Sequence, residues 1–212
     1  MAYVVKESFL TLQGEGAQAG RAAVFCRFTG CNLWSGLEKD RATAACRFCD
    51  TDFRGTDGVG GGRFADPDAL ADHLRALWDA EARGGGPYVV FTGGEPLLQL
   101  DADLVGACKD RGFEVAVETN GTKAVPAGID WVCVSPKPRS ELVVHAGNEL
   151  KLVFPQEELP PGPFESLAFS HFFLQPMDGP DREANTARAV AWCRAHPQWR
   201  LSIQTHKLLG IP

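Results

Sequence analysis

The chain has 212 residues, a formal net charge of −6 and a pI of about 5.4, with 44% hydrophobic and 23% charged residues. This length and composition suit one globular domain with its own core and exclude global disorder. No basic run offers a surface for nucleic acid, and no apolar stretch approaches the roughly 20 residues that a membrane-spanning helix needs. We therefore expect a cytoplasmic protein with no nucleic-acid or membrane partner, in which residues 1–212 form a single domain.

The first predicted strand covers residues 22–28, AAVFCRF, and a polar segment with several cysteines follows it. A glycine-rich loop at residues 54–64 ends that segment. A helix comes next, because Asp66 is placed to cap it, Pro67 stands at its first position and a run of glycines ends it. Residues 88–92, YVVFT, predict a buried parallel strand.

Helices and strands alternate through the rest of the chain. We expect a helix over residues 101–111, strands at 113–119, 131–135, 149–154 and 171–176, a helix over 181–196 and a last strand at 199–206. This pattern is typical of an α/β fold with a parallel sheet. Three helices are too few for an eight-fold barrel. The sequence therefore predicts a partial or open (β/α) barrel of about six to seven mostly parallel strands with about three helices.

Glycine, proline and polar residues follow most of the predicted strands. The segments are TGC at 29–31, TGGEP at 92–96, ETNG at 118–121, SPKP at 135–138, QPMD at 175–178 and QTHK at 204–207. Ligands of parallel sheets bind beyond the carboxyl ends of the strands. We therefore expect one continuous site along this edge of the sheet.

Three cysteines, Cys31, Cys46 and Cys49, follow the first predicted strand with the spacing C-x14-C-x2-C. In a reducing compartment, clustered cysteines more often bind metal or do redox work than form disulfides. A structural zinc site needs four ligands, and no fourth one lies nearby in the sequence. Three thiolates suit a 4Fe–4S cluster with one iron left open, although four cysteines normally hold such clusters. A zinc site completed by His206 stays an alternative.

Together with FTGGEP at residues 91–96, these cysteines resemble the radical S-adenosylmethionine (SAM) superfamily, in which three cysteines hold a 4Fe–4S cluster and SAM chelates the fourth iron. The usual spacing there is C-x3-C-x2-C, so this chain has 14 residues in place of three. That departure, with LQGEG at 12–16, CDT at 49–51 and the final QTHK…P, is similar to the 7-carboxy-7-deazaguanine synthase family. The resemblance extends from Leu12 to Pro212.

The resemblance implies a lyase that converts 6-carboxy-5,6,7,8-tetrahydropterin to 7-carboxy-7-deazaguanine in queuosine and 7-deazapurine biosynthesis. The reaction is a radical ring contraction with loss of ammonia, begun when a reduced cluster cleaves SAM and the resulting radical takes hydrogen from C6 of the pterin. The implied cofactors are a 4Fe–4S cluster, SAM and Mg2+. The implied partners are the small-molecule substrate, a flavodoxin- or ferredoxin-like electron donor and a second copy of the chain in a homodimer.

The resemblance also implies roles for residues near the cluster. The region 31–64 would bind it, with Cys31, Cys46 and Cys49 as ligands that support radical generation. Thr51 would bind Mg2+, which usually keeps waters and takes further ligands from its substrate.

For SAM, the TGGEP turn is the clearest candidate. Gly93 and Gly94 let backbone groups approach a ligand closely, and Glu95 can accept hydrogen bonds from the ammonium of SAM; a plain turn before a helix is the alternative. The other implied SAM contacts are Phe48, Cys49, Asp50, Glu118, Asn120, Ser135, Pro136, Lys137, Gln175, Pro176, Met177 and Asp178.

For the substrate, Arg27 can pair bidentately with the C6 carboxylate of the pterin, which lysine could not do. A surface salt bridge is the alternative for this arginine. The resemblance implies further substrate contacts from Leu12, Gln13, Gly14, Glu15, Thr92, His206 and Pro212, whose terminal carboxylate would reach the substrate.

Two other functions remain open at this point. One is a small radical SAM activating enzyme that abstracts hydrogen from a protein glycine, which ETNG would suit but the 14-residue insert would not. The other is a zinc-stabilised binding module without catalysis, which would explain the cysteines but not TGGEP or the polar strand ends.

Overall fold

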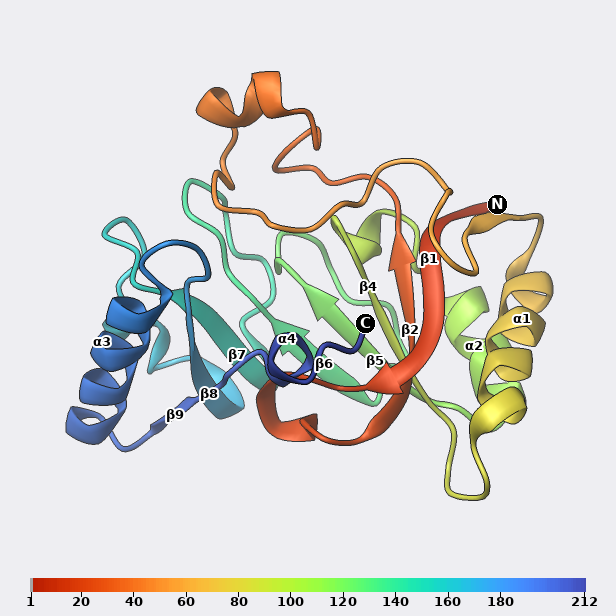
Figure 1. Cartoon of the computed structure of the whole chain (residues 1–212). Helices are drawn as coiled ribbons and strands as arrows, with labels where there is room; N and C mark the ends of the chain where they lie inside the picture. The colour runs from red at the N-terminus through yellow and green to blue at the C-terminus, as the bar shows by residue number, and fades with distance from the viewer. Residues whose placement is uncertain (1) are drawn as a thin grey trace.

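The computed structural model describes residues 2–212, which form one nine-stranded sheet flanked by helices (Figure 1). The strand order is β3-β1-β2-β4-β5-β6-β7-β8-β9, so β3 and β9 are separate edges and the sheet stays open. The strands are β1 (Tyr3–Leu12), β2 (Ala22–Phe28), β3 (Gly62–Phe64), β4 (Tyr88–Gly93), β5 (Glu114–Thr119), β6 (Trp131–Val134), β7 (Ala146–Phe154), β8 (Ala168–Pro176) and β9 (Trp199–Leu201). The helices are α1 (Pro67–Glu81), α2 (Ala102–Asp110), α3 (Arg182–Ala195) and α4 (Thr205–Leu209), with short 3-10 helices η1 (Gly16–Gln18), η2 (Glu38–Thr43), η3 (Pro96–Leu98) and η4 (Gly162–Phe164).

The predicted fold class is confirmed. From β2 through β4 to β9, each strand pairs in parallel with the next one, which makes seven parallel strands. The predicted cap of α1 is also present, since Asp66 accepts from the backbone N–H of Ala69. Asp101, at the start of the helix expected over 101–111, caps α2 in the same way by accepting from the backbone N–H of Leu104. Local sequence therefore sets the ends of these helices.

Strand β1 has no counterpart among the predicted strands. It pairs antiparallel with β2 and β3, and its register shifts between Val5 and Glu7. This bulge breaks the period-2 alternation that identifies a strand, because Val5 faces the core while Lys6 and Glu7 both line the inner face of the sheet. Strand β3 was likewise missed inside the predicted loop at 54–64.

The two faces of the sheet have different coverings. On the outer face, α1 and α2 pack over β1, β2, β4 and β5, and α3 packs at the other end of the sheet (Figure 1). On the inner face, a small apolar layer of Ala23, Tyr88, Val90 and Ala116 fills the amino-terminal end of the strands. The carboxyl ends of the strands are left for polar side chains.

The predicted last strand at 199–206 is wrong beyond Leu201. Pairing of β9 with β8 stops there, and the chain turns back so that the backbone N–H of Thr205 donates to the carbonyl of Gly14 at 3.0 Å. The short helix α4 then lies in front of the sheet (Figure 1). The path of this segment therefore depends on a tertiary hydrogen bond, which the local sequence does not predict.

Within residues 2–212 we find no helix with the length and apolar composition required to cross a bilayer.

Candidate active site

A cavity of about 810 Å³ lies at the carboxyl ends of the strands. Polar strand ends, the N-terminal loop, the cysteine-containing segment and α4 line it together. Twenty-three of the candidates lie in its lining: Leu12, Gln13, Gly14, Glu15, Arg27, Cys46, Phe48, Cys49, Asp50, Thr51, Thr92, Gly93, Gly94, Glu118, Asn120, Ser135, Lys137, Gln175, Pro176, Met177, Asp178, His206 and Pro212. Three candidates, Cys31, Glu95 and Pro136, lie outside it.

The cysteine segment, defined here as residues 31–54, crosses above this edge of the sheet (Figure 1). The two thiols of its C-x2-C pair interact, which lowers the pKa of Cys49 to about 6 and raises the pKa of Cys46. Burial raises the pKa of Cys31, which lies at the rim of a second, shallower pocket of about 340 Å³. All three thiols are free.

The donor set fits a 4Fe–4S cluster. Among residues 2–212, no group of three or more histidine, cysteine, aspartate or glutamate side chains is arranged around a single metal ion. A cubane cluster does not require such a group, because each cysteine binds a different iron. The TGGEP turn packs directly against Cys31, since a Cβ on Gly94 would lie 2.7 Å from the Cβ of Cys31.

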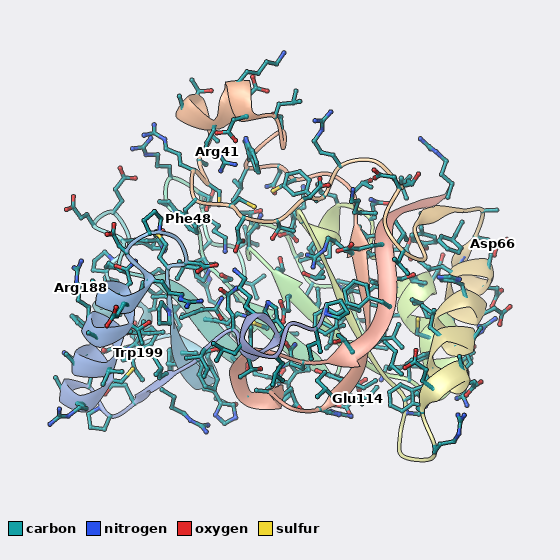
Figure 2. The ribbon with its side chains drawn as sticks, in the orientation of Figure 1. Arg41, Phe48, Asp66, Glu114, Arg188 and Trp199 are labelled. Carbon is teal, nitrogen blue, oxygen red and sulfur yellow. The ribbon has the colours of Figure 1, made fainter. Side chains whose placement is uncertain are left out.

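The 14 residues between Cys31 and Cys46 supply the contacts that hold the C-x2-C turn. Trp34 packs edge-on against Phe53, with ring centroids 5.6 Å apart. Arg41 lies over the Trp34 ring at 4.1 Å and donates to the carbonyls of Arg47 at 2.9 Å and Cys49 at 3.1 Å. Figure 2 shows Arg41 above Phe48. Neither Arg41 nor Trp34 was predicted as a site residue, although a lone tryptophan in a polar stretch is a usable signal of a local core.

Glu95 in the TGGEP turn is buried and hydrogen-bonded within the protein. Its carboxylate accepts from the Thr119 hydroxyl at 2.7 Å and from the backbone N–H groups of Asn120 at 2.7 Å and Leu97 at 3.0 Å, and the residue is fully buried. Burial raises the pKa of this carboxyl. These contacts tie the turn after β4 to the end of β5, and Glu95 is not among the residues that line the cavity. Its expected contact with SAM stays a prediction.

The glycines of the same turn are needed for packing against the backbone. At Gly93, with φ +152°, a Cβ would lie 2.5 Å from the Phe28 carbonyl oxygen, and at Gly94 it would lie 2.3 Å from the Gly30 carbonyl oxygen. The turn therefore fits directly against the chain that leads into Cys31. Both glycines still line the cavity.

The strand ends on either side hold the cysteine segment in place. Asn120 donates to Asn32 at 3.0 Å, next to Cys31. Lys137 donates to the Ser135 hydroxyl at 2.6 Å. Its charge adds to the lowering of the Cys49 pKa and opposes, without reversing, the rise of the Cys46 pKa that Cys49 and burial cause. Pro136, between these two cavity residues, does not line the cavity.

Arg27 is partly engaged already. Its Nε donates to Glu7 at 2.7 Å, and the side chain is 20% exposed. Within residues 2–212 its two terminal nitrogens have no hydrogen-bond partner. Both the expected carboxylate clamp and the alternative salt bridge are therefore compatible with this geometry, since the salt bridge uses only one edge of the guanidinium.

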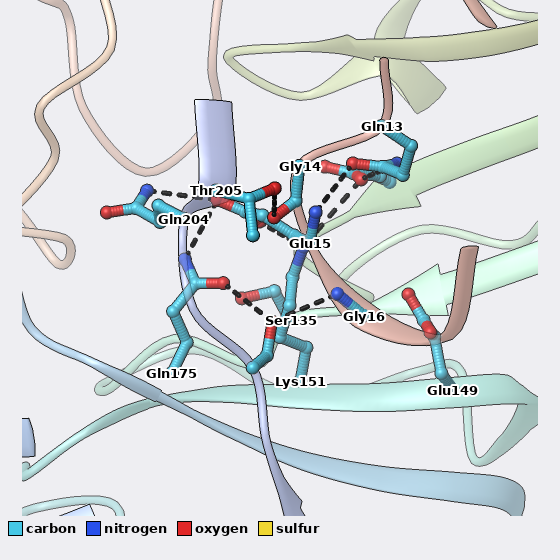
Figure 3. Close-up of polar contacts among 12 residues, drawn as sticks. Gln13, Gly14, Glu15, Gly16, Ser135, Glu149, Lys151, Gln175, Gln204 and Thr205 are labelled. Atoms are coloured by element: carbon cyan, nitrogen blue, oxygen red, sulfur yellow. Dashed lines mark hydrogen bonds and ion pairs between the residues drawn. The ribbon is translucent and has the colours of Figure 1, made fainter. Parts of the chain in front are cut away.

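A buried polar network forms the floor of the cavity (Figure 3). Glu15 lies at its centre and accepts from Gln175 at 3.0 Å, from Gln204 at 2.9 Å and from Lys151. Burial alone would raise the pKa of Glu15, but the Lys151 ammonium and the Gln204 amide overcome that effect and lower it to about 2. We use the name buried network for Glu15, Glu118, Glu149, Lys151, Gln175, Ser202 and Gln204.

Lys151 and Glu149 were not among the predicted site residues. Both lie on β7, two residues apart, while Leu150 and Leu152 between and after them are fully buried on the opposite face. Two charged residues on one face of an otherwise apolar parallel strand are a signal of a polar interior, because parallel strands are normally apolar on both faces. The network also includes Glu118, which accepts from Gln13 at 2.9 Å and so lies with the expected substrate residues.

The two glycines of LQGEG each face a network or site residue. A Cβ on Gly14 would lie 2.2 Å from Nδ1 of His206, and one on Gly16, which has φ +65°, would lie 2.5 Å from a carboxylate oxygen of Glu149. Thr205 also donates its hydroxyl to the Gly14 carbonyl at 3.0 Å. The N-terminal loop thus fits against α4 at Gly14 and against β7 at Gly16 only because these positions lack side chains.

Comparisons with known proteins agree with this geometry. The sequence profile of the radical SAM superfamily matches residues 40–137. The chain is 66% identical to a 7-carboxy-7-deazaguanine synthase from Bordetella pertussis and 63% identical to one from Caulobacter vibrioides, with 100% of both chains covered in each case. The crystal structure of QueE from Escherichia coli aligns with a TM-score of 0.66 at 26% identity, over 96% of this chain and 94% of that one.

Proposed function

Because the chain belongs to the 7-carboxy-7-deazaguanine synthase family of radical SAM enzymes, we propose that it converts 6-carboxy-5,6,7,8-tetrahydropterin to 7-carboxy-7-deazaguanine. The observation that carries this proposal is the single cavity that joins the C-x2-C cysteines to the buried network. One side offers thiols for a cluster, and the other offers fixed acceptors and donors for a polar heterocycle.

The cofactor side of the proposal rests on residues of the cysteine segment. Cys31, Cys46 and Cys49 would hold a 4Fe–4S cluster, and bound SAM with that cluster would supply the radical chemistry. The turns that contain Gly94, Asn120 and Lys137 would position the segment, because each already contacts it or acts on its thiols.

The substrate side rests on complementary hydrogen-bonding chemistry. Glu15 is an ionised acceptor for the N–H groups of the pterin amide and amine edge. Arg27 has two terminal nitrogens available for a carboxylate. His206 and Gln13 border the same space, which suits a planar ligand that is both a donor and an anion.

Further parts of the proposal come from family membership. Thr51 would contribute to a Mg2+ site and lies in the cavity lining next to Asp50. A lyase classification, a flavodoxin- or ferredoxin-like electron donor, a homodimer and a cytoplasmic location are proposed on the same basis. Pro212 also lines the cavity, where its carbonyl oxygen accepts from the Thr11 hydroxyl at 2.8 Å.

The test is anaerobic reconstitution of the chain with iron and sulfide, followed by incubation with the carboxytetrahydropterin, SAM and a reductant. Mass detection should find 7-carboxy-7-deazaguanine together with 5′-deoxyadenosine. Cleavage of SAM without any deazapurine would reject the proposed substrate and leave a different radical SAM reaction. A colourless protein with stoichiometric zinc would reject the radical chemistry itself.

A further inference from the structure

Lys151 is a buried cation with no role so far in the proposed reaction. Its side chain is 5% exposed, it forms an ion pair with Glu15, and it lies 3.7 Å from Glu118. Burial disfavours its charged form, but the carboxylates of Glu118, Glu15 and Glu149 raise its pKa well above the usual value. A lysine with three carboxylates around it therefore remains an ammonium.

The contacts of Glu15 show what this ammonium does. An ionised carboxylate offers about four acceptor sites. Gln175 and Gln204 both donate to Oε1, and Lys151 donates to Oε2. Within residues 2–212 this leaves one acceptor site on Oε2, and Glu15 lines the cavity. Three donors from three different segments thus fix the direction in which the remaining site points.

Lys151 is the one cation among the residues of the buried network, so their charge balance depends on it. Glu15, Glu118 and Glu149 lie around one ammonium, so the network carries more negative than positive charge. Without the ammonium, three carboxylates would share a buried site, and like charges in such a site disfavour one another's ionisation. Other titratable groups that act on Lys151 or Glu15 are Cys133 from β6 and His206 from α4. Neither would replace the lost cation next to Oε2.

We propose that Lys151 is a positioning residue that keeps the Glu15 carboxylate charged and correctly oriented to accept an N–H donor from the pterin ring. This inference rests on the proposed function for the identity of the ligand. Glu149 has the opposite effect on Glu15, because its carboxylate competes for the same ammonium. It also holds the N-terminal loop by accepting from the backbone N–H of Ala17 at 2.8 Å.

The test measures binding of 6-carboxypterin, a stable fluorescent analogue, to the full chain by fluorescence titration at several pH values. The variants are Lys151→Met, which removes the charge, and the double variant Lys151→Met with Glu149→Gln. Glu149 does not line the cavity, and glutamine can still accept from Ala17. Protonation of the ligand affects the variant and the wild-type protein equally, so it cancels in the ratio of their dissociation constants at each pH.

At pH 6 we expect Lys151→Met to bind at least about tenfold more weakly, which is the value of one hydrogen bond to a charged group. The loss should shrink as the pH rises toward 8, because Glu15 regains its charge, and Glu149→Gln should restore much of the affinity at pH 6. A loss that is independent of pH and is not rescued by Glu149→Gln, in a variant with an unchanged thermal midpoint, would overturn the inference and leave Lys151 a purely structural residue.

A measurement on the wild-type chain keeps the inference testable if Lys151→Met fails to fold. The 13C signal of the Glu15 carboxyl, assigned with Glu15→Gln, should stay in its ionised position down to about pH 4. Titration of Glu15 above pH 5 would overturn the inference.

The product assay on wild-type enzyme separates the two possible failures. If 7-carboxy-7-deazaguanine forms but Lys151→Met binds normally at every pH, only the inference fails. If no deazapurine forms although the pH-dependent loss is seen, only the proposed reaction fails.

Discussion

The cysteine segment and the buried network line the same cavity but are built in opposite ways. The cysteine segment is one continuous stretch with no strand and a single short 3-10 helix, η2, and side-chain contacts of Trp34, Phe53 and Arg41 hold it. The buried network takes residues from β5, β7, β8 and two loops, and the sheet fixes most of their backbones.

This difference in construction matches the two proposed roles of the site, which are cluster binding and substrate recognition. The three candidate cluster ligands lie close together in the chain, and local side-chain contacts hold their segment. The buried network combines residues from strands, which hold side chains more accurately than loops do, with Glu15 and Gln204 from loops. Changes in one region should therefore affect cluster chemistry or ligand binding separately.

Cys49→Ser should have the largest effect. It removes one of only three thiols available to the cluster, so iron content and SAM cleavage should both fall to background. Binding of 6-carboxypterin should stay at the wild-type level, because the buried network is untouched. Iron analysis, 5′-deoxyadenosine formation and fluorescence titration check these points.

Cys193→Ser is the matched control for that variant, since Cys193 is a half-buried free thiol on α3. It should retain the cluster. Loss of pterin binding in Cys49→Ser would show that the two regions are not separable.

Gly14→Ala should have a smaller effect in the opposite region. Its Cβ would lie 2.2 Å from Nδ1 of His206, so α4 must shift away from the N-terminal loop. Overpacking of this kind costs about 1–3 kcal/mol, which corresponds to roughly 5- to 150-fold weaker 6-carboxypterin binding if the cost falls on the bound geometry. Iron content should not change.

Gly106→Ala is the control for Gly14→Ala, because it tests whether alanine at any glycine position weakens 6-carboxypterin binding. Gly106 lies inside α2 with nothing within 4 Å of its would-be Cβ. It should stabilise the fold by about 0.5–1 kcal/mol in denaturant unfolding, because alanine is the better helix former. Normal ligand binding by Gly14→Ala would contradict the proposed fit between the loop and α4.

Lys207→Met should have the smallest effect, although Lys207 joins the cysteine segment to the loop after β8. Lys207 on α4 pairs with Asp50 of the cysteine segment at 2.8 Å and with Asp178 after β8 at 2.6 Å. Its side chain is 30% exposed, so the pair of bridges should contribute about 1 kcal/mol or less, and less at high salt. Thermal unfolding at low and high salt checks this, with the exposed Lys123→Met as control. A loss of stability that salt does not reduce would argue for a packing role of the Lys207 stem.

Much of the molecule follows from local sequence. Hydrophobic runs predict the seven parallel strands, and Asp66 predicts the start of α1, because caps and buried strands depend on neighbouring residues only. The polar strand ends predict where the cavity lies, since parallel strands bring their carboxyl ends to one edge. The spacing of Cys31, Cys46 and Cys49 points to the cluster for the same local reason.

Tertiary structure decided the rest. A bulge hid β1, and a hydrogen bond to Gly14 turned residues 202–209 into a loop and helix. The contacts of the Glu95 carboxylate with Thr119 and Asn120 come from the end of the neighbouring strand, β5, and no local pattern predicts them. Lys151 gains its significance from Glu15, 136 residues away in the chain. Sequence determines which groups are available, but the free energy of a buried charge depends on its neighbours in space, and those neighbours exist only in the folded chain.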